Sequence, residues 1–140
     1  MEKYSYYNKK NSDTTLWFHG SSVGEIMSIL PLINEFEKDK SIKRILLTSS
    51  TVSSASIIKK KSLKKTTHVY YPFDIGFICN NFLDKWRPKI AIFVDSEIWP
   101  NMYKKINSRK IPLILINARI TSKSFNRFLY SSSGIDLVLL

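Results

Sequence analysis

The residues best suited to chemistry lie near the amino terminus, in residues 17–25, which have the sequence Trp-Phe-His-Gly-Ser-Ser-Val-Gly-Glu. The apolar run ending at Phe18 is typical of a buried strand, and the apolar spacing from Ile26 onward is typical of an amphipathic helix. Glycines and serines between a strand and a helix allow backbone N–H groups to face a ligand. Glu25 would then project a carboxylate toward that ligand from the first helical turn.

The same residues also fit a purely structural role. Ser22 and Glu25 are three positions apart, which is the spacing of a capping box, in which the serine caps the helix and the glutamate bonds back to the chain. Both interpretations of Glu25, a helix cap and a catalytic carboxylate, stay open on this segment alone.

Further polar residues follow other apolar runs, at residues 95–101 (Asp-Ser-Glu-Ile-Trp-Pro-Asn) and 117–119 (Asn-Ala-Arg). The carboxyl ends of parallel strands share one edge of a sheet, so Glu97 and Arg119 are expected near Glu25. A glutamate after a buried strand is costly unless it is paired or lies in a solvated cleft. Glu97 is therefore either an ion-pair partner or a functional carboxylate. Arg119 either binds phosphate bidentately or ties down the loop of Glu97, and Trp99 is expected in the core.

These residues need elements to position them, and short apolar runs alternate with amphipathic ones along the chain. The pattern predicts strands at residues 15–18, 44–48, 67–71, 90–94, 113–116 and 136–140, with helices at 25–38, 53–61, 74–85, 100–109 and 122–129. Asp74 is expected to cap the third helix, and Pro100 to begin the fourth. This alternation predicts an α/β fold with a Rossmann-like, doubly wound and mainly parallel sheet.

Charge narrows the range of partners. The 140-residue chain carries 22 Lys and Arg against 11 Asp and Glu, a net charge of +11, which favours anionic partners such as phosphorylated lipid or a membrane surface. Five lysines fall within residues 59–65, where a solvated helix end and loop is expected. No basic patch is interleaved with aromatic residues, so nucleic acid is not an expected partner.

The composition also bears on cofactors and location. One cysteine, Cys79, and two histidines far apart in sequence give no metal cluster, so no metal is expected. No Gly-x-Gly-x-x-Gly follows a predicted strand, so no dinucleotide cofactor is expected either. No apolar run is long enough for a transmembrane helix, which predicts a cytoplasmic chain that is soluble or peripheral to a membrane.

Several motifs together resemble the N-terminal domain of the Kdo transferases (3-deoxy-D-manno-octulosonic acid transferases). They are His-Gly-Ser-Ser-Val-Gly-Glu at 19–25, Tyr-Pro-Phe-Asp at 71–74, Trp-Arg-Pro at 86–88, the segment 95–101 and Asn-Ala-Arg at 117–119. They occur in the family's order and at similar spacing. The resemblance extends from about residue 16 to residue 127, which is most of the chain.

The resemblance implies the N-terminal half of a GT-B fold, in which two Rossmann-like domains face a cleft. Such enzymes move Kdo from CMP-Kdo to a lipid A precursor in lipopolysaccharide synthesis, with inversion at the sugar carbon. Glu25 matches the family's general base, and Glu97 matches a second functional glutamate. Ser22, Gly24 and Arg119 are the expected substrate contacts, and no cofactor is implied.

The resemblance also implies a domain organisation. Residues 1–14 would form a polar amino-terminal segment and residues 15–140 an acceptor-side domain. The nucleotide-sugar domain, which would bind CMP-Kdo, is missing from this sequence, so the chain is expected to be inactive alone. The implied location is peripheral, at the cytoplasmic face of the bacterial inner membrane. The alternative is a non-catalytic basic module that binds anionic lipid or a membrane.

Overall fold

The computed structural model of the chain describes residues 15–94, 98–117 and 137–139. Strands and helices alternate along these residues, as the sequence predicts. The elements are β1 (Thr15–His19), α1 (Val23–Lys38), β2 (Arg44–Ser49), α2 (Val52–Lys59), β3 (Thr66–Tyr70), α3 (Gly76–Trp86), β4 (Pro88–Val94), α4 (Pro100–Ser108), β5 (Leu113–Ile116) and β6 (Leu137–Leu139). Pro100 begins α4 as predicted, because its missing N–H costs nothing at a helix start. The helix predicted at 122–129 lies outside the described residues.

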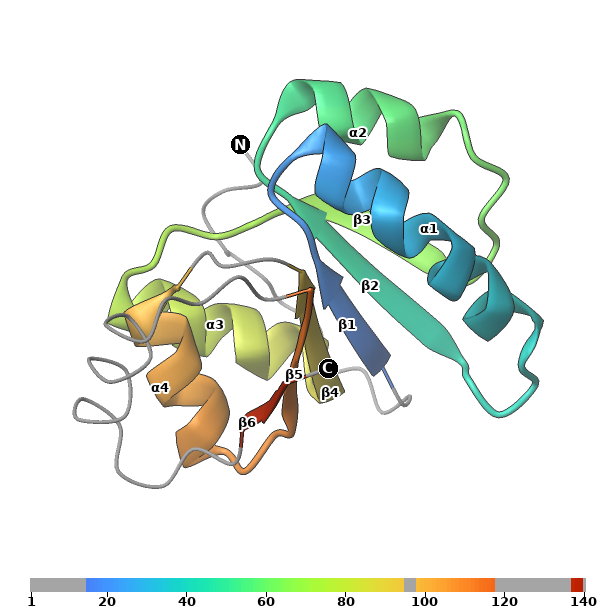
Figure 1. Ribbon diagram of the computed structural model, residues 1–140. Helices are drawn as coiled ribbons and strands as arrows, with labels where there is room; N and C mark the ends of the chain where they lie inside the picture. Colours follow the sequence, from blue (N-terminus) through green and yellow to red (C-terminus); the bar gives the residue numbers. More distant parts are fainter. Residues whose placement is uncertain (1–14, 95–97, 118–136, 140) are drawn as a thin grey trace.

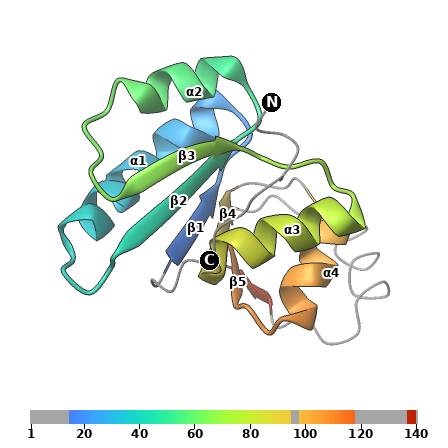
Figure 2. The same cartoon turned by 180° about the vertical axis from the view of Figure 1, so that it is seen from behind.

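The strands form one sheet in the order β3-β2-β1-β4-β5-β6, and every pairing is parallel. Helices α1 and α2 lie on one face, and α3 and α4 lie on the other (Figures 1 and 2). The predicted doubly wound, Rossmann-like arrangement is therefore confirmed. No helix in the described ranges combines the length and the apolar character that crossing a bilayer requires.

Two apolar cores lie on the two faces of the sheet, and β1 contributes to both. Successive strand residues point to opposite faces, so Phe18 packs with α1 while Trp17 packs with α3 and α4. Both side chains are fully buried. Trp99 is partly buried and packs, as predicted, against the core that contains Trp17. A strand covered on both faces reads as a continuous apolar run, which explains the sequences of β1 and β4.

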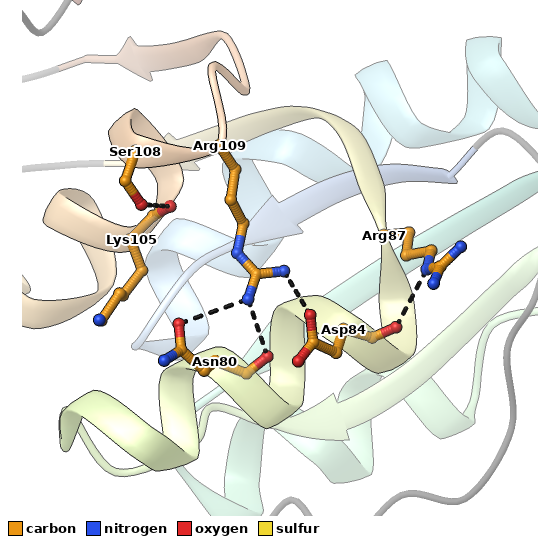
Figure 3. A network of polar contacts seen from close by, with 6 residues as sticks. All are labelled: Asn80, Asp84, Arg87, Lys105, Ser108 and Arg109. Carbon is orange, nitrogen blue, oxygen red and sulfur yellow. Dashed lines mark hydrogen bonds and ion pairs between the residues drawn. The ribbon is translucent and has the colours of Figure 1, made fainter.

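Helices α3 and α4 are joined by a polar contact at their surface. The Arg109 guanidinium donates to Asp84 Oδ1 at 2.7 Å and to the backbone and side-chain oxygens of Asn80 (Figure 3). Arg87 ends α3 in a left-handed conformation, with φ of 43°, and Pro88 begins β4. The predicted break at residues 86–88 is thus present.

The strand order places a topological switch point between β1 and β4. The chain runs from β1 outward to β2 and β3, and then returns to the other side of β1 as β4. Ligands of doubly wound sheets bind beyond the carboxyl ends of the strands at such a point. His19, the last residue of β1, lies opposite Phe93 near the end of β4.

Candidate active site

The turn from β1 to α1 begins at this switch point and is closely packed. The Gly20 N–H donates to the Thr48 carbonyl at 3.1 Å, which ties the turn to β2. A Cβ atom at Gly20 would lie 3.1 Å from Ile26 Cδ1 and 3.2 Å from Glu25 Cβ. Both contacts are tighter than carbon atoms normally make. Glycine at this position therefore lets the turn pass close beneath the first turn of α1.

Glu25 is held by hydrogen bonds to both of its carboxylate oxygens. The Ser21 N–H donates to Oε2 at 2.6 Å, and the Ser22 hydroxyl donates to Oε1 at 3.0 Å. In return, the Glu25 N–H donates to Ser22 Oγ at 3.3 Å. The predicted cap at Ser22 is confirmed, although the glutamate reaches the N–H of Ser21 rather than that of the cap residue.

The capping hydrogen bonds do not occupy all the acceptor sites of the Glu25 carboxylate. Glu25 is only partly buried, and within the described ranges it forms no salt bridge. An ionised carboxylate has about four acceptor sites, and the two hydrogen bonds leave others for a ligand proton. The cap and the chemistry are therefore compatible, because the cap orients the group that would react.

A buried polar network supports the turn from below. His19 is 1% exposed; its Nδ1 lies 2.9 Å from Thr48 Oγ1, and its Nε2 lies 3.2 Å from Ser21 Oγ. Thr48 Oγ1 also accepts from Trp17 Nε1 at 3.0 Å and donates to the Phe18 carbonyl at 3.3 Å. Since the hydroxyl proton of Thr48 goes to Phe18, Nδ1 of the imidazole is the donor and Nε2 accepts from Ser21.

Burial lowers the pKa of His19 to about 3, with a hydrogen bond to the Thr48 backbone offsetting part of this effect. The imidazole is therefore neutral at pH 7, and both of its nitrogens are engaged. These contacts make His19 a residue that positions Ser21, and through Ser21 the Glu25 carboxylate.

Asp74 differs from its predicted role. Helix α3 begins after Ile75, without a side-chain cap. The Asp74 carboxylate instead accepts from the N–H groups of Asn101 and Met102, at 3.0 and 2.7 Å. These are orphan donors at the start of α4, whose own cap position, Trp99, has no acceptor side chain. Asp74 thus caps α4, and the prediction that it caps α3 was wrong.

The predicted site residues fall into two groups. Ser22, Gly24 and Glu25 lie together at the start of α1. Glu97 and Arg119 lie outside the described residues, so their predicted position beside Glu25 stays a prediction. The strands that precede them are described, and β4 lies between β1 and β5 in the sheet.

Gly24 faces open space. A Cβ atom added there would have no described atom within 4 Å, so nothing in the packing of these residues requires glycine.

No three His, Cys, Asp or Glu side chains of the described residues gather into a group able to hold a metal ion.

Sequence comparison identifies the family. The family described as 3-deoxy-D-manno-octulosonic-acid transferase (kdotransferase) matches residues 1–138. The chain belongs to the kdotransferase family. The resemblance drawn from the motifs is therefore confirmed.

Relatives within the kdotransferase family are found in bacteria and in a plant. A 3-deoxy-D-manno-octulosonic acid transferase of Rickettsia felis is 40% identical over 124 residues, which cover 89% of this chain and 26% of the relative. The Rickettsia prowazekii enzyme of the same name is 38% identical over 124 residues (89% and 27%). A probable mitochondrial 3-deoxy-D-manno-octulosonic acid transferase of Arabidopsis thaliana is 37% identical over 113 residues (81% and 25%). The chain thus spans about a quarter of the length of these relatives.

Sequence reasoning missed the network beneath Glu25 in this kdotransferase-family chain. The sequence placed His19 in the motif at 19–25 and Thr48 at the end of a predicted strand, without connecting the two residues. A histidine ending an apolar strand is a signal for a buried polar contact. Its partner on β2 could not be named, because the register that pairs His19 with Thr48 is a tertiary property.

Proposed function

We propose that this chain supplies the acceptor side of an inverting glycosyltransferase that moves Kdo from CMP-Kdo to a lipid A precursor. The observation that carries the proposal is the Glu25 carboxylate, which two hydrogen bonds orient at the amino end of α1. Membership in the kdotransferase family supports the choice of reaction. A lipid acceptor would place the reaction at a membrane surface, at the cytoplasmic face of the bacterial inner membrane.

Glu25 would act as the general base. As the acceptor hydroxyl oxygen attacks the anomeric carbon, its proton passes to Glu25, the new C–O bond forms, and the bond to the CMP phosphate breaks. CMP leaves as a stabilised phosphate anion, so no strong general acid is needed. The amino end of α1 carries a partial positive charge that favours an ionised carboxylate, which is the form that a base requires.

The neighbouring residues would divide the remaining tasks. The open space at Gly24 lets an acceptor approach the helix closely, and Ser22 orients the base. Glu97 would stabilise the positive charge that develops on the sugar, and Arg119 would contact the acceptor. His19 and Thr48 would position the turn without touching substrate.

The test uses a chimaera, because the chain spans about a quarter of its relatives. Residues 1–138 replace the matching segment of the Rickettsia felis enzyme, and transfer from CMP-Kdo to a lipid A precursor is measured. Glu25→Gln retains the size of the side chain and removes the base. The rate should fall about 10²- to 10⁴-fold, the usual contribution of general base catalysis, while the melting temperature changes little.

Thr51→Ala is the matched control, because Thr51 caps α2 just as Ser22 caps α1. It should reduce stability and leave the transfer rate unchanged. A Glu25→Gln chimaera that keeps its rate would refute the catalytic role and leave Glu25 as a cap only. A chimaera that is folded but inactive before any substitution would refute the proposed acceptor-side function.

A further inference from the structure

Four aromatic rings meet next to the turn between β1 and α1, and each comes from a different part of the chain. They belong to His19 at the end of β1, Tyr71 just after β3, Phe93 in β4 and Trp99 at the start of α4. The first three side chains are buried and Trp99 is partly buried. These rings therefore join the carboxyl ends of three strands to the start of α4.

Tyr71 and Trp99 pack directly against the imidazole of His19. The ring centroids of His19 and Tyr71 are 4.1 Å apart, and those of Tyr71 and Trp99 are 4.6 Å apart. Trp99 also meets His19 edge-on, at 6.1 Å, and Phe93 lies 5.0 Å from His19. Tilted and edge-on contacts are favourable for aromatic rings. The imidazole is therefore confined by rings as well as by its two hydrogen bonds.

Asp74 holds the start of α4, and with it Trp99, against the segment that follows β3. Its carboxylate accepts from the N–H groups of Asn101 and Met102 at 3.0 and 2.7 Å, and its carbonyl accepts from Asn101 Nδ2 at 2.7 Å. The start of α4 is thus attached to residues 71–74 twice, by a ring contact at Tyr71 and by hydrogen bonds at Asp74. The two ends of the Tyr-Pro-Phe-Asp motif supply these attachments.

The contacts continue from His19 to the candidate base. His19 Nε2 accepts from the Ser21 hydroxyl at 3.2 Å, and the Ser21 N–H donates to Glu25 Oε2 at 2.6 Å. A displaced imidazole would shift Ser21, and with it the N–H group that orients the carboxylate. Contacts therefore run without a break from the start of α4 to Glu25.

We propose that Tyr71, Asp74 and Trp99 are positioning residues for Glu25. They fix the start of α4 against His19, and His19 in turn fixes Ser21 and the orientation of the carboxylate. Their effect on Kdo transfer rests on the proposed function, whereas their effect on the hydrogen bond between Ser21 and Glu25 does not.

The first test measures amide hydrogen exchange of the 140-residue chain by NMR. Trp99→Leu retains an apolar side chain and removes the ring contacts. Exchange of the Ser21 N–H should become at least about tenfold faster, as for the loss of a hydrogen bond to a charged group. The Ser54 N–H, which donates to Thr51 Oγ1 at 3.2 Å, is the internal reference and should keep its rate.

Two further variants separate positioning from packing. Trp99→Phe retains a ring and should restore the parent exchange rate of Ser21. It breaks no hydrogen bond within the described part of the chain, because the buried Trp99 Nε1 has no partner there. Phe36→Leu is the matched control, since Phe36 is a partly buried ring in the core on the other face of the sheet, 5.9 Å from Phe18. It should lower stability without accelerating Ser21 relative to Ser54.

Asp74→Ala tests the same series of contacts from its other end. It removes the acceptor of two α4 N–H groups and should also accelerate exchange of the Ser21 N–H. This variant decides the question if Trp99→Leu does not fold. Unchanged Ser21 exchange in a folded Trp99→Leu or Asp74→Ala chain, equal acceleration in Phe36→Leu, or no rescue by Trp99→Phe would each overturn the proposal.

The second test measures transfer in the chimaera. Trp99→Leu should lower kcat by up to about 100-fold, the cost of misplacing a reacting group by about 1 Å, with a smaller change in the KM for CMP-Kdo. Trp99→Phe should restore kcat. Hydrogen exchange is measured without substrate, so the two proposals fail separately. Faster Ser21 exchange with an unchanged kcat would support the positioning of Glu25 and refute its role as the base.

Discussion

The amino ends of α1 and α2 are a natural pair for comparison, because they follow neighbouring parallel strands at the same sheet edge. Each begins with a capping hydroxyl followed by valine. Ser22 Oγ accepts from the Glu25 N–H at 3.3 Å, and Thr51 Oγ1 accepts from the Ser54 N–H at 3.2 Å. The third helical residue differs: Glu25 is partly exposed, whereas Ser54 is fully buried and contacts Thr51 Oγ1 at 2.7 Å.

The comparison separates capping from chemistry. Both helices solve the problem of orphan N–H groups with the same backbone geometry, so a cap by itself does not indicate a function. What distinguishes α1 is an oriented charge beside open space at Gly24. In α2 the hydroxyl at the matching position, that of Ser54, is hydrogen-bonded to the capping residue Thr51.

The strongest test of this difference exchanges the residue types. Ser54→Asp would place a carboxylate at a fully buried position, and should destabilise the chain by at least about 3 kcal/mol. Glu25→Ser removes a partly exposed charge and should cost about 1 kcal/mol. Urea denaturation measures both. Similar losses for the two would mean that the ends are equivalent.

The next test is a pH titration, because His19 contacts Ser21 in the turn before α1. Its folded pKa of about 3 is below the ordinary histidine pKa of 6.5, so below pH 6.5 the unfolded state binds a proton that the folded state does not. Stability should be constant above pH 6.5 and fall on acidification by up to about 1.4 kcal/mol per pH unit.

The control for this titration is a histidine substitution elsewhere. His19→Gln should abolish the slope between pH 6.5 and 5, whereas His68→Gln, in β3, should retain it. The slope is read from urea denaturation at each pH. A parent chain with flat stability over this range would contradict a buried, neutral His19.

Removing either helix cap should cost the same stability, but only removal of the Ser22 cap should lower activity. Ser22→Ala and Thr51→Ala each remove a side-chain acceptor from a helix start, at a cost of about 1 kcal/mol. In the chimaera, only Ser22→Ala should lower the transfer rate, because it also frees Glu25 Oε1. Parallel thermal melts and rate assays test this prediction, and equal rates would show that the Ser22 contact does not orient the base.

The smallest expected effect is at the second helical residue. Gly24→Ala should stabilise the chain by about 0.5–1 kcal/mol, because glycine is unfavourable within a helix and the added methyl group meets open space. The same change should raise the KM for the acceptor. Ser53→Ala at the matching position of α2 is the control and should leave KM unchanged. An unchanged KM in Gly24→Ala would remove Gly24 from the proposed substrate contacts.

The glycine-serine turn shows what the sequence could predict about the site. Ser22 and Glu25 are three residues apart, so their hydrogen bonds were foreseeable from local geometry. The strand and helix order was equally foreseeable, because each element carries its own periodicity. The predicted proximity of Glu97 and Arg119 to Glu25 concerns residues outside the described ranges and stays a prediction.

The alternating elements, the cap on α1, the family and the excess of positive charge could all be recognised in the amino-acid sequence. The capping of α4 by Asp74 and the contact between His19 and Thr48 could not, and they became visible only in the folded chain. The physical reason is distance along the chain. Interactions within one helical turn depend on neighbouring residues, whereas these contacts join segments that become neighbours only when the crossovers set the strand order and register.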